Sequence, residues 1–149
     1  MAQTTAAISS NDYTVWTSPD GTTFTDRSGY AVRIQPASGT RKSGQTNTFS
    51  GDIPITTSGK RDAQMVHIDY VYTEEAGGLF EVLRAAYEAN TDLYIRYAPK
   101  GGQTTEFLLT TLVGKLTSLD YPQGDANSGE PVILGADLFV GAITKSVAP

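Results

Sequence analysis

Between Ala63 and Lys145 the sequence alternates apolar and polar residues in several long runs, and one short helical pattern interrupts them. In the first run Val66, Ile68 and Tyr70 share one side of the chain, because successive side chains of a strand point to opposite faces. The last run is the most regular, and its apolar residues are Val132, Leu134, Ala136, Leu138, Val140 and Ala142. Such runs bury one face of a sheet, so the sequence predicts a mainly β fold.

The helical pattern covers about residues 78–90. Its apolar residues recur at the spacing of an amphipathic helix, and they are Leu79, Val82, Leu83 and Ala86. Asn90 follows, and asparagine accepts the left-handed conformation that commonly ends a helix. A helix of about three turns must cover its apolar stripe with a sheet. We therefore expect one short α-helix packed against the β structure.

Further strands are predicted around this region. An Asp-Gly turn at Asp20 separates the first two and predicts a hairpin. In the third, Tyr30, Val32 and Ile34 share one face. Glu106–Tyr121 is predicted as one long strand, in which Gly114 marks a bulge or bend. The shorter strands are expected at Tyr13–Ser18, Thr22–Thr25, Tyr30–Gln35 and Leu93–Tyr97.

Residues 36–62 show no periodicity and are rich in Gly, Ser and Thr. A structureless connection of this length is uncommon in a compact domain and is usually functional or ordered by binding. The segment carries a charge of +2, and the rest of the chain carries −7. We predict a long loop that contacts another copy of the chain, with a merely solvated loop as the alternative. The residues expected at this contact are Arg41, Lys42, Phe49, Asp52, Ile53, Ile55, Lys60 and Arg61.

The 149 residues fit a single domain, with residues 1–12 as an N-terminal arm, 36–62 as the loop and 63–145 as a β-rich core. Cysteine is absent, which excludes disulfides and Cys-ligated metals. The N-terminal arm has no Lys or Arg and only a short apolar patch, so we expect no signal peptide. No apolar run is long enough for a membrane-spanning helix, and we expect a soluble protein without membrane insertion.

The sequence offers little for catalysis. His67, the only histidine, and Asp69 lie on one face of a predicted strand, which suits a metal site or an acid–base pair. Without a third partner such a pair is more typical of a polar strand face. Glu74 and Glu75 are better explained by the dipole of the following helix than as catalytic carboxylates. We therefore predict no enzyme, no cofactor and no metal.

The sequence also bears on binding of nucleic acid and of carbohydrate. A net charge of −5 argues against tight binding of nucleic acid, which needs clustered Lys and Arg. Trp16, Phe24 and Tyr30 suit an aromatic platform for carbohydrate, although aromatic residues near a hairpin are more typical of core or cross-strand pairs. A monomeric β-sandwich that binds carbohydrate is therefore the most distant alternative.

The order of several stretches resembles a known family, the major tail tube proteins of long-tailed bacteriophages and their prophage relatives. The first stretch is Leu79–Tyr87, which leads through Asn90–Asp92 into Leu93–Tyr97. Gly114–Pro122 and Gly129–Val132 then resemble the closing strands of that family. The resemblance covers the β-rich core and depends on the order of these stretches.

The resemblance implies a β-sandwich or half-barrel with one helix, copies of which close into hexameric rings lined by a continuous β-barrel. Stacked rings then form a tail tube. It also implies that residues 36–62 and 1–12 reach neighbouring subunits and rings, and that tail tip and tail terminator proteins are partners. The location implied is the tail of a virion made in the bacterial cytoplasm. A tube of a contractile tail or of a type VI secretion-like machine is the nearer alternative.

A tail tube carries the tape-measure protein and then DNA, and an acidic lumen would let the polyanion slide. The charge of −7 outside residues 36–62 agrees with this expectation. The candidate lumen residues are Glu106, Asp120 and Asp137. The sequence leaves two alternatives open, since either the face with Glu106 and Asp120 or the face with Asp137 can point inward.

Overall fold

The computed structural model describes residues 2–149, so Met1, the first residue of the predicted N-terminal arm, lies outside the described residues. Within that range the chain forms eleven strands and one helix, which confirms a mainly β fold with one short α-helix. The strands before the helix are β1 (Thr14–Ser18), β2 (Thr25–Asp26), β3 (Ala31–Pro36), β4 (Arg41–Thr46), β5 (Ile55–Arg61) and β6 (Gln64–Val71). After helix α1 (Leu79–Ala89) come β7 (Tyr94–Ala98), β8 (Phe107–Thr111), β9 (Gly114–Leu119), β10 (Ile133–Val140) and β11 (Ile143–Val147).

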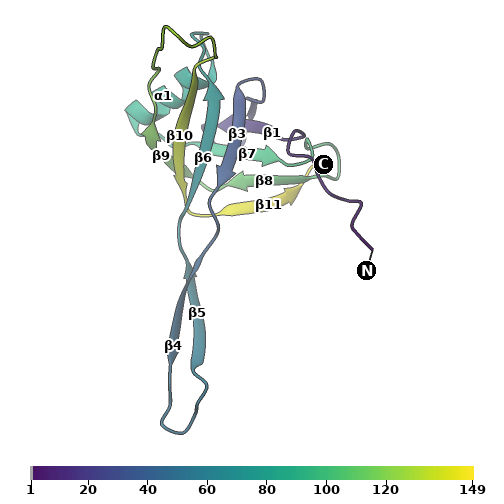
Figure 1. Cartoon of the computed structure of the whole chain (residues 1–149), viewed down its shortest axis with the longest axis vertical. Coiled ribbons are helices and arrows are strands. Elements are labelled where there is room, and N and C mark those ends of the chain that lie inside the picture. Colours follow the sequence, from purple (N-terminus) through teal and green to yellow (C-terminus); the bar gives the residue numbers. More distant parts are fainter. Residues whose placement is uncertain (1) are drawn as a thin grey trace.

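Two antiparallel sheets build the body of the molecule. One has five strands in the order β11-β8-β7-β1-β2, and the other has four in the order β3-β6-β10-β9. The two sheets cross, with α1 at one side, and the third sheet, the hairpin β4-β5, projects away from both (Figure 1). Because β3 leads into β4 and β5 leads into β6, this hairpin prolongs two strands of the four-stranded sheet.

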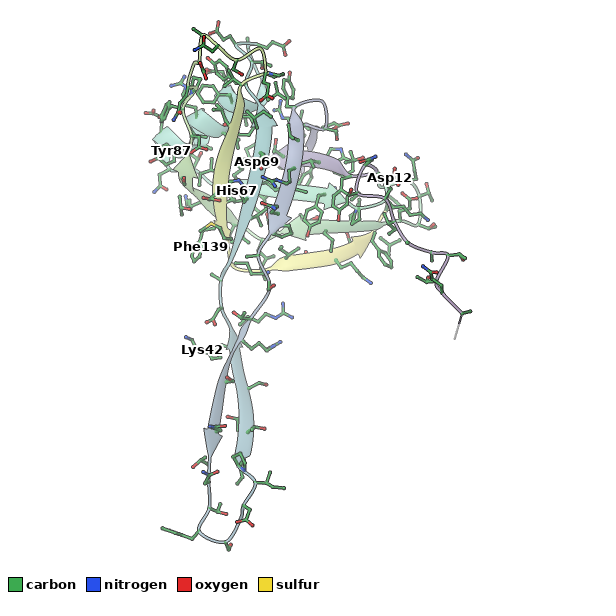
Figure 2. The ribbon with its side chains drawn as sticks, viewed as in Figure 1. Asp12, Lys42, His67, Asp69, Tyr87 and Phe139 are labelled. Atoms are coloured by element: carbon green, nitrogen blue, oxygen red, sulfur yellow. The ribbon has the colours of Figure 1, made fainter. Side chains whose placement is uncertain are left out.

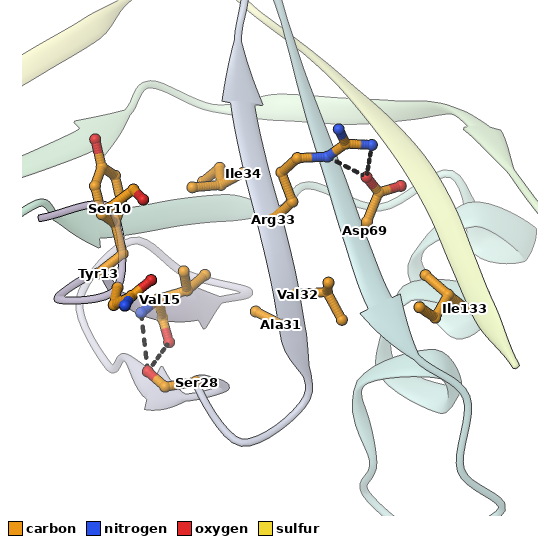
Figure 3. A pocket seen from close by; sticks show the side chains of 11 residues that line it. Ser10, Tyr13, Val15, Ser28, Ala31, Val32, Arg33, Ile34, Asp69 and Ile133 are labelled. Carbon is orange, nitrogen blue, oxygen red and sulfur yellow. Dashed lines mark hydrogen bonds and ion pairs between the residues drawn. The ribbon is translucent and has the colours of Figure 1, made fainter. Parts of the chain in front are cut away.

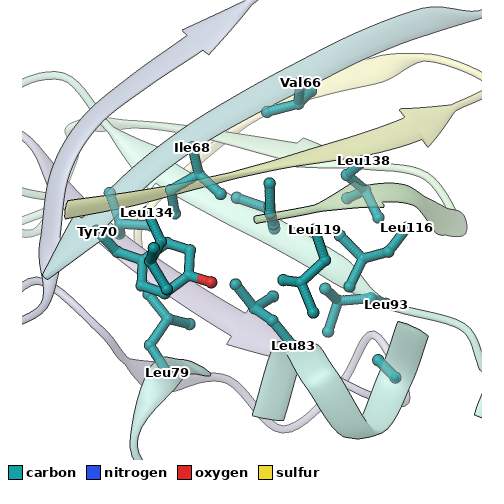
Figure 4. Close-up of a cluster of buried hydrophobic side chains, with 14 of the residues drawn as sticks. Val66, Ile68, Tyr70, Leu79, Leu83, Leu93, Leu116, Leu119, Leu134 and Leu138 are labelled. Atoms are coloured by element: carbon teal, nitrogen blue, oxygen red, sulfur yellow. The ribbon is translucent and has the colours of Figure 1, made fainter. Parts of the chain in front are cut away.

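The core lies between the sheets and the helix (Figure 4). The alternation predicted for β6 and β10 is confirmed, since their apolar residues on one face are buried. The buried residues of these two strands are Val66, Ile68, Tyr70, Leu134, Ala136, Leu138 and Val140. The helix adds Leu79, Phe80, Leu83 and Ala86.

The predicted helix is confirmed, and its end is well defined. Asn90 adopts the left-handed conformation (φ 50°, ψ 42°), and its N–H donates to the carbonyls of Ala86 and Tyr87. The last turn carries no basic residue, but Lys115 of β9 donates to the Asn90 carbonyl at 2.6 Å. A cation at this position stabilises the negative end of the helix dipole. The same amino group pairs with Asp92 at 2.8 Å.

The prediction that Glu74 and Glu75 serve the helix dipole was wrong. Helix α1 begins at Leu79, and the acidic residue of its first turn is Glu81. Glu75 instead accepts a hydrogen bond of 2.6 Å from the Tyr30 hydroxyl. The two glutamates therefore belong to the connection between β6 and α1.

Two predicted strands in the first part of the chain are shorter or less regular than expected. The partner strand of β1 is Thr25–Asp26, because Asp20 accepts hydrogen bonds from the amides of Thr22 and Thr23 and holds them in the turn. In β3 a register shift after Ala31 leaves Val32 unpaired. Val32 is exposed, although the period of two predicted that it shares a face with Tyr30 and Ile34, which are partly buried.

The long strand predicted at Glu106–Tyr121 is two strands in different sheets. β8 ends at Thr111 and β9 begins at Gly114, and the chain crosses between the sheets at this point. A Cβ atom on Gly114 would lie 2.6 Å from Cγ1 of Val140. The glycine thus permits the close approach to β10 that the crossing requires. Lys145 lies on β11 of the five-stranded sheet.

The prediction of a structureless loop at residues 36–62 was wrong, because most of this segment forms the hairpin β4-β5. Its strands pair from Arg41 opposite Arg61 to Thr46 opposite Ile55. All their residues are exposed, so neither face needs apolar side chains and no period appears in the sequence.

Candidate assembly surfaces

The hairpin arm, defined here as residues 40–62, carries every residue predicted at the contact with another copy. Arg41 and Lys42 lie on β4, and Ile55, Lys60 and Arg61 lie on β5. The loop between these strands holds Phe49, Asp52 and Ile53. Figure 2 shows the side chains of the arm standing clear of the body.

The tip of the hairpin arm is apolar and exposed. Phe49 is fully exposed, and Ile53 and Ile55 are also among the exposed large apolar residues. Burying a side chain of this size contributes about 1.5–3 kcal/mol, which the isolated chain does not gain here. The tip is therefore a surface that gains stability when another surface covers it.

The stem of the hairpin arm is basic. Asp62 partly offsets this charge, since its carboxylate lies 3.4 Å from the Lys42 amino group and accepts a hydrogen bond from the Thr40 hydroxyl. Arg41 donates to the Gly59 carbonyl at 3.2 Å across the hairpin. These exposed contacts add little stability, so the arm holds its shape mainly through the backbone ladder of β4 and β5.

The four-stranded sheet ends in two edge strands, β3 and β9, and an isolated backbone bridge joins the start of β9, at Gly114, to Leu93. In the part of the chain that the structure describes, no strand pairs with the outer edge of β3 or of β9. Unpaired edges offer rows of backbone donors and acceptors to another chain. These two edges are therefore candidate sites for pairing between copies.

A cavity of about 860 Å³ borders the edge strand β3 (Figure 3). Val15 lines it from β1, and Tyr13 lines it from the segment before β1. Ala31 and Ile34 line it from β3. The exposed Val32 also lines it. Polar and charged residues line it as well, among them Arg33 and Asp69, so the edge of β3 lies beside a hollow with mixed polar and apolar walls.

The outer face of the four-stranded sheet carries a row of charged side chains, the His67 network, which consists of Arg33, His67, Asp69 and Asp137. Arg33 Nε and Nη2 each lie 2.8 Å from Asp69 Oδ2. Asp69 Oδ1 lies 2.9 Å from His67 Nε2, and Asp137 Oδ1 lies 2.6 Å from His67 Nδ1. The network therefore spans β3, β6 and β10.

The protonation of these groups follows from their contacts. The hydrogen bond with Asp137 is the largest influence on the pKa of His67 and raises it; partial burial lowers it, and Asp69 raises it further. The net pKa lies above the usual value of 6.5. For Asp69, burial alone would raise the pKa, but the hydrogen bonds from Arg33 and His67 outweigh burial and lower it.

The three candidate lumen residues do not lie on the two faces to which the sequence assigned them. Asp137 lies on β10 within the His67 network, and Asp120 joins the same sheet, where its carboxylate accepts a hydrogen bond of 3.1 Å from the Gly135 amide. Glu106 lies on the five-stranded sheet beside β8, where it accepts a hydrogen bond from the Gln103 amide. The grouping of Glu106 with Asp120 was wrong because it assumed one continuous strand between them.

Residues 2–149 contain no cluster of three or more His, Cys, Asp or Glu side chains arranged to hold a metal ion. Both ring nitrogens of His67 already face carboxylate oxygens. Over the same range, no helix has the length and apolar character to cross a bilayer.

The three aromatic residues considered for carbohydrate binding have separate surroundings. Trp16 is half-buried against a small cluster that includes Leu108. Phe24 lies under the Arg96 guanidinium, at 3.8 Å from the ring centroid. Tyr30 packs on the main core. Arg96 is also the cross-strand partner of Trp16, so Trp16 and Phe24 lie on the five-stranded sheet and the turn beside it, whereas Tyr30 belongs to the main core.

Sequence reasoning missed Arg33 and the pairing of His67 with Asp137. The spacing of His67 and Asp69 predicted that they share a face, which is confirmed. Asp137 is separated from His67 by 70 residues and meets it only through the register of β6 with β10. The alternation in β10 placed Asp137 on the outward face, and this was the only signal available.

The sequence and the fold can be compared with those of known proteins. No protein-family model matches the sequence, and no curated protein matches it at a significant level. Several solved structures are similar. A chain of the tube-terminating cap of the anti-feeding prophage matches with a TM-score of 0.73 and 14% identity, over 99% of this chain and 96% of that one.

A chain of the sheath–tube complex of the extracellular contractile injection system PVC, in its extended state, matches with a TM-score of 0.74 and 12% identity. That match covers 96% of this chain and 93% of the other. The SPP1 tail tube matches with a TM-score of 0.60 and 17% identity, over 95% of this chain and 80% of that one. At these identities the shared property is the fold, and the chain has a tail-tube fold.

Proposed function

We propose that this chain is the structural subunit of a tail-like tube, in which hexameric rings stack into a hollow conduit. The observation that carries the proposal is the similarity in fold to tube and cap chains, which covers nearly the full length of this chain and of each matched chain. The exposed hairpin arm supports it, because its apolar tip gains stability only when another surface covers it.

Ring closure is proposed to occur at the two edge strands of the four-stranded sheet. When β3 of one copy pairs with β9 of the next, the backbone groups of both edges are satisfied. Repeated around a ring, this pairing closes the sheets into a barrel without edges. The cavity beside β3 provides space for the side chains that the neighbour brings.

Stacking is proposed to depend on the hairpin arm. Its basic stem complements the rest of the chain, which carries −7, and such complementarity favours contact between copies. Residues 2–12 are exposed as well and provide a second segment for contacts between rings. The residues proposed at the arm's contacts are Arg41, Lys42, Phe49, Asp52, Ile53, Ile55, Lys60 and Arg61.

The cargo and partners follow from the same proposal. In a phage tail, the tube would hold tape-measure protein and then DNA, and tip and terminator proteins would bound it. The particle would be a virion assembled in the bacterial cytoplasm. Asp120 and Asp137 supply negative charge if the outer face of the four-stranded sheet lines the lumen, and this charge lets DNA slide. Glu106 then lies on another surface.

A tube inside a contractile sheath is the second candidate. The TM-scores of 0.74 and 0.73 with chains of a contractile injection system and of the anti-feeding prophage cap exceed the 0.60 with the SPP1 tail tube. A gene for a sheath protein beside the gene for this chain would favour the contractile candidate over the non-contractile one.

Negative-stain electron microscopy of the concentrated protein, with its mass from light scattering, tests the proposal. We expect rings or hollow tubes of uniform width. The matched variant replaces residues 40–62 with Asn-Gly, which joins β3 to β6 by a short hairpin turn. We expect this variant to fold but to form no stacked tubes. Tubes formed by the variant would contradict the proposal. A wild-type protein that stays monomeric even when preformed tube ends are added as nuclei would contradict it too.

A further inference from the structure

The His67 network connects the strands of the four-stranded sheet on its outer face. Asp137 and His67 are directly opposite each other on β10 and β6, and Arg33 is opposite Asp69 on β3 and β6. Figure 2 shows His67 and Asp69 side by side on this face. The edge strand β3 is thus linked through two carboxylates and one imidazole to the central strand β10.

The imidazole of His67 occupies a well-defined position against the backbone of β10. A Cβ atom on Gly135 would lie 2.8 Å from Cε1 of His67 and 3.1 Å from Oδ2 of Asp120. The absence of a side chain at Gly135 therefore makes room for the ring. The amide of Gly135 donates to Asp120, which brings the end of β9 to the same place.

The protonation state of His67 decides how many of these contacts the ring can make. Both nitrogens face a carboxylate oxygen at hydrogen-bonding distance. An imidazolium donates through both nitrogens, whereas a neutral imidazole donates through only one. In the neutral ring the other nitrogen turns a lone pair toward a carboxylate, and that contact is lost or repulsive.

We propose that His67 is a pH-sensitive brace of the four-stranded sheet. As an imidazolium it joins β6 to β10 and, through Asp69 and Arg33, holds the edge strand β3. As a neutral ring it releases one carboxylate, which weakens the link from Asp137 on β10 through His67 and Asp69 to Arg33 on the edge strand β3. The charged groups that face His67 are Asp69 on its own strand, Asp137 on β10, Asp120 at the end of β9 and, through Asp69, Arg33 on β3.

The direction of the pH effect follows from the raised pKa of His67. A group whose pKa is higher in the folded state stabilises that state fully below its unfolded pKa, about 6.5. This stabilisation is lost as the pH rises through the folded pKa. Since β3 is the edge proposed to close the ring, assembly should weaken over the same range; this extension depends on the proposed function.

The first test is an NMR titration of the wild-type protein with labelled histidine. Because His67 is the only histidine, a single imidazole signal reports its pKa without assignment. We expect a midpoint above 6.5 and a lower midpoint in Asp137→Asn. A wild-type midpoint at or below 6.5, or one that Asp137→Asn leaves unchanged, would overturn the proposal.

The second test compares the melting temperatures of wild type and His67→Gln at pH 5.5 and pH 8.5. Both proteins share every other titrating group, so the difference between them isolates His67. We expect the melting temperature of the wild type to exceed that of His67→Gln by less at pH 8.5 than at pH 5.5, because the imidazolium loses its proton as the pH rises. An equal difference at both pH values would contradict the brace.

Light scattering at the same two pH values tests the link to assembly. We expect wild-type tubes to be shorter or fewer at pH 8.5, and tubes of His67→Gln to respond less. Equal wild-type assembly at both values would contradict control of the edge by His67. Absence of assembly at either value would count against the proposed tube function, while the titration and melting experiments would still decide the brace.

Discussion

The strands β6 and β10 bury one apolar face completely, whereas the strands β4 and β5, which prolong the same sheet, are exposed on every residue. All four are antiparallel strands, and the ladder of β4 with β5 has a register shift between Arg41 and Ser43. The body therefore has a core that stabilises it without a partner. An isolated two-stranded hairpin is marginal in water, so the hairpin arm depends on what it contacts.

This difference separates two kinds of sequence constraint within one chain. In the body, the buried apolar residues pack against the opposite sheet or the helix. In the hairpin arm, Phe49 and Ile53 have no comparable contacts and are exposed. We expect an intermolecular contact to explain their presence, and the three pairs of variants below are designed to separate that contact from folding.

The largest expected effect on folding comes from Leu138→Ala in β10. Leu138 is fully buried, and truncation of a buried leucine costs about 2–5 kcal/mol because it leaves a cavity. The matched change in the hairpin arm, Ile55→Ala, should alter the free energy of unfolding by less than about 0.5 kcal/mol. Urea unfolding measures both. Similar losses in the two variants would remove the contrast between the body and the arm.

A smaller loss is expected for Gly114→Ala, at the crossing between the sheets. The new Cβ would lie 2.6 Å from Cγ1 of Val140 and 2.9 Å from the Phe139 carbonyl oxygen, and overpacking of this kind costs about 1–3 kcal/mol. Gly59→Ala in β5 is the control, because its Cβ would meet the nearest atom, of Lys42, at 3.5 Å. Unfolding curves in which Gly59→Ala is the more damaging change would reverse the expected order.

The same contrast explains which parts of the fold the sequence predicts. β6, β10 and α1 are predicted because each buries one face and therefore shows a period. β4 and β5 bury neither face, so their sequence shows no period and was interpreted as a loop. The shared face of Val32 and the single long strand through Gly114 were wrong predictions, because a bulge and a crossing between sheets depend on neighbouring strands, which a local pattern does not report.

The sequence predicted the residues of the hairpin arm as a candidate surface but not the side-chain pairs formed between distant strands. The exposed apolar and basic residues of the hairpin arm stand out in the sequence because they are unusual in a flexible loop. The pairing of His67 with Asp137 depends on the register between strands far apart in the chain. Glu106 and Asp120 were assigned to one face by the period of two along a single strand. This assignment fails because the predicted strand divides between two sheets.

The smallest expected effect on folding, and the most informative about assembly, belongs to the double variant Phe49→Ser with Ile53→Ser at the tip of the hairpin arm. Both side chains are exposed, so the free energy of unfolding should change by less than about 0.5 kcal/mol. Their burial between copies would contribute about 1.5–3 kcal/mol each, and a loss of that size in every contact should abolish tube formation at concentrations where the wild type assembles.

The control for this double variant is Thr56→Ser, a conservative change at another exposed position of the hairpin arm. It should leave both unfolding and assembly as in the wild type. If the double variant unfolds like the wild type and forms no tubes, the tip acts between copies. If it forms tubes normally, the apolar tip is not an assembly contact, and the contrast between the body and the arm reflects only the absence of a core in the arm.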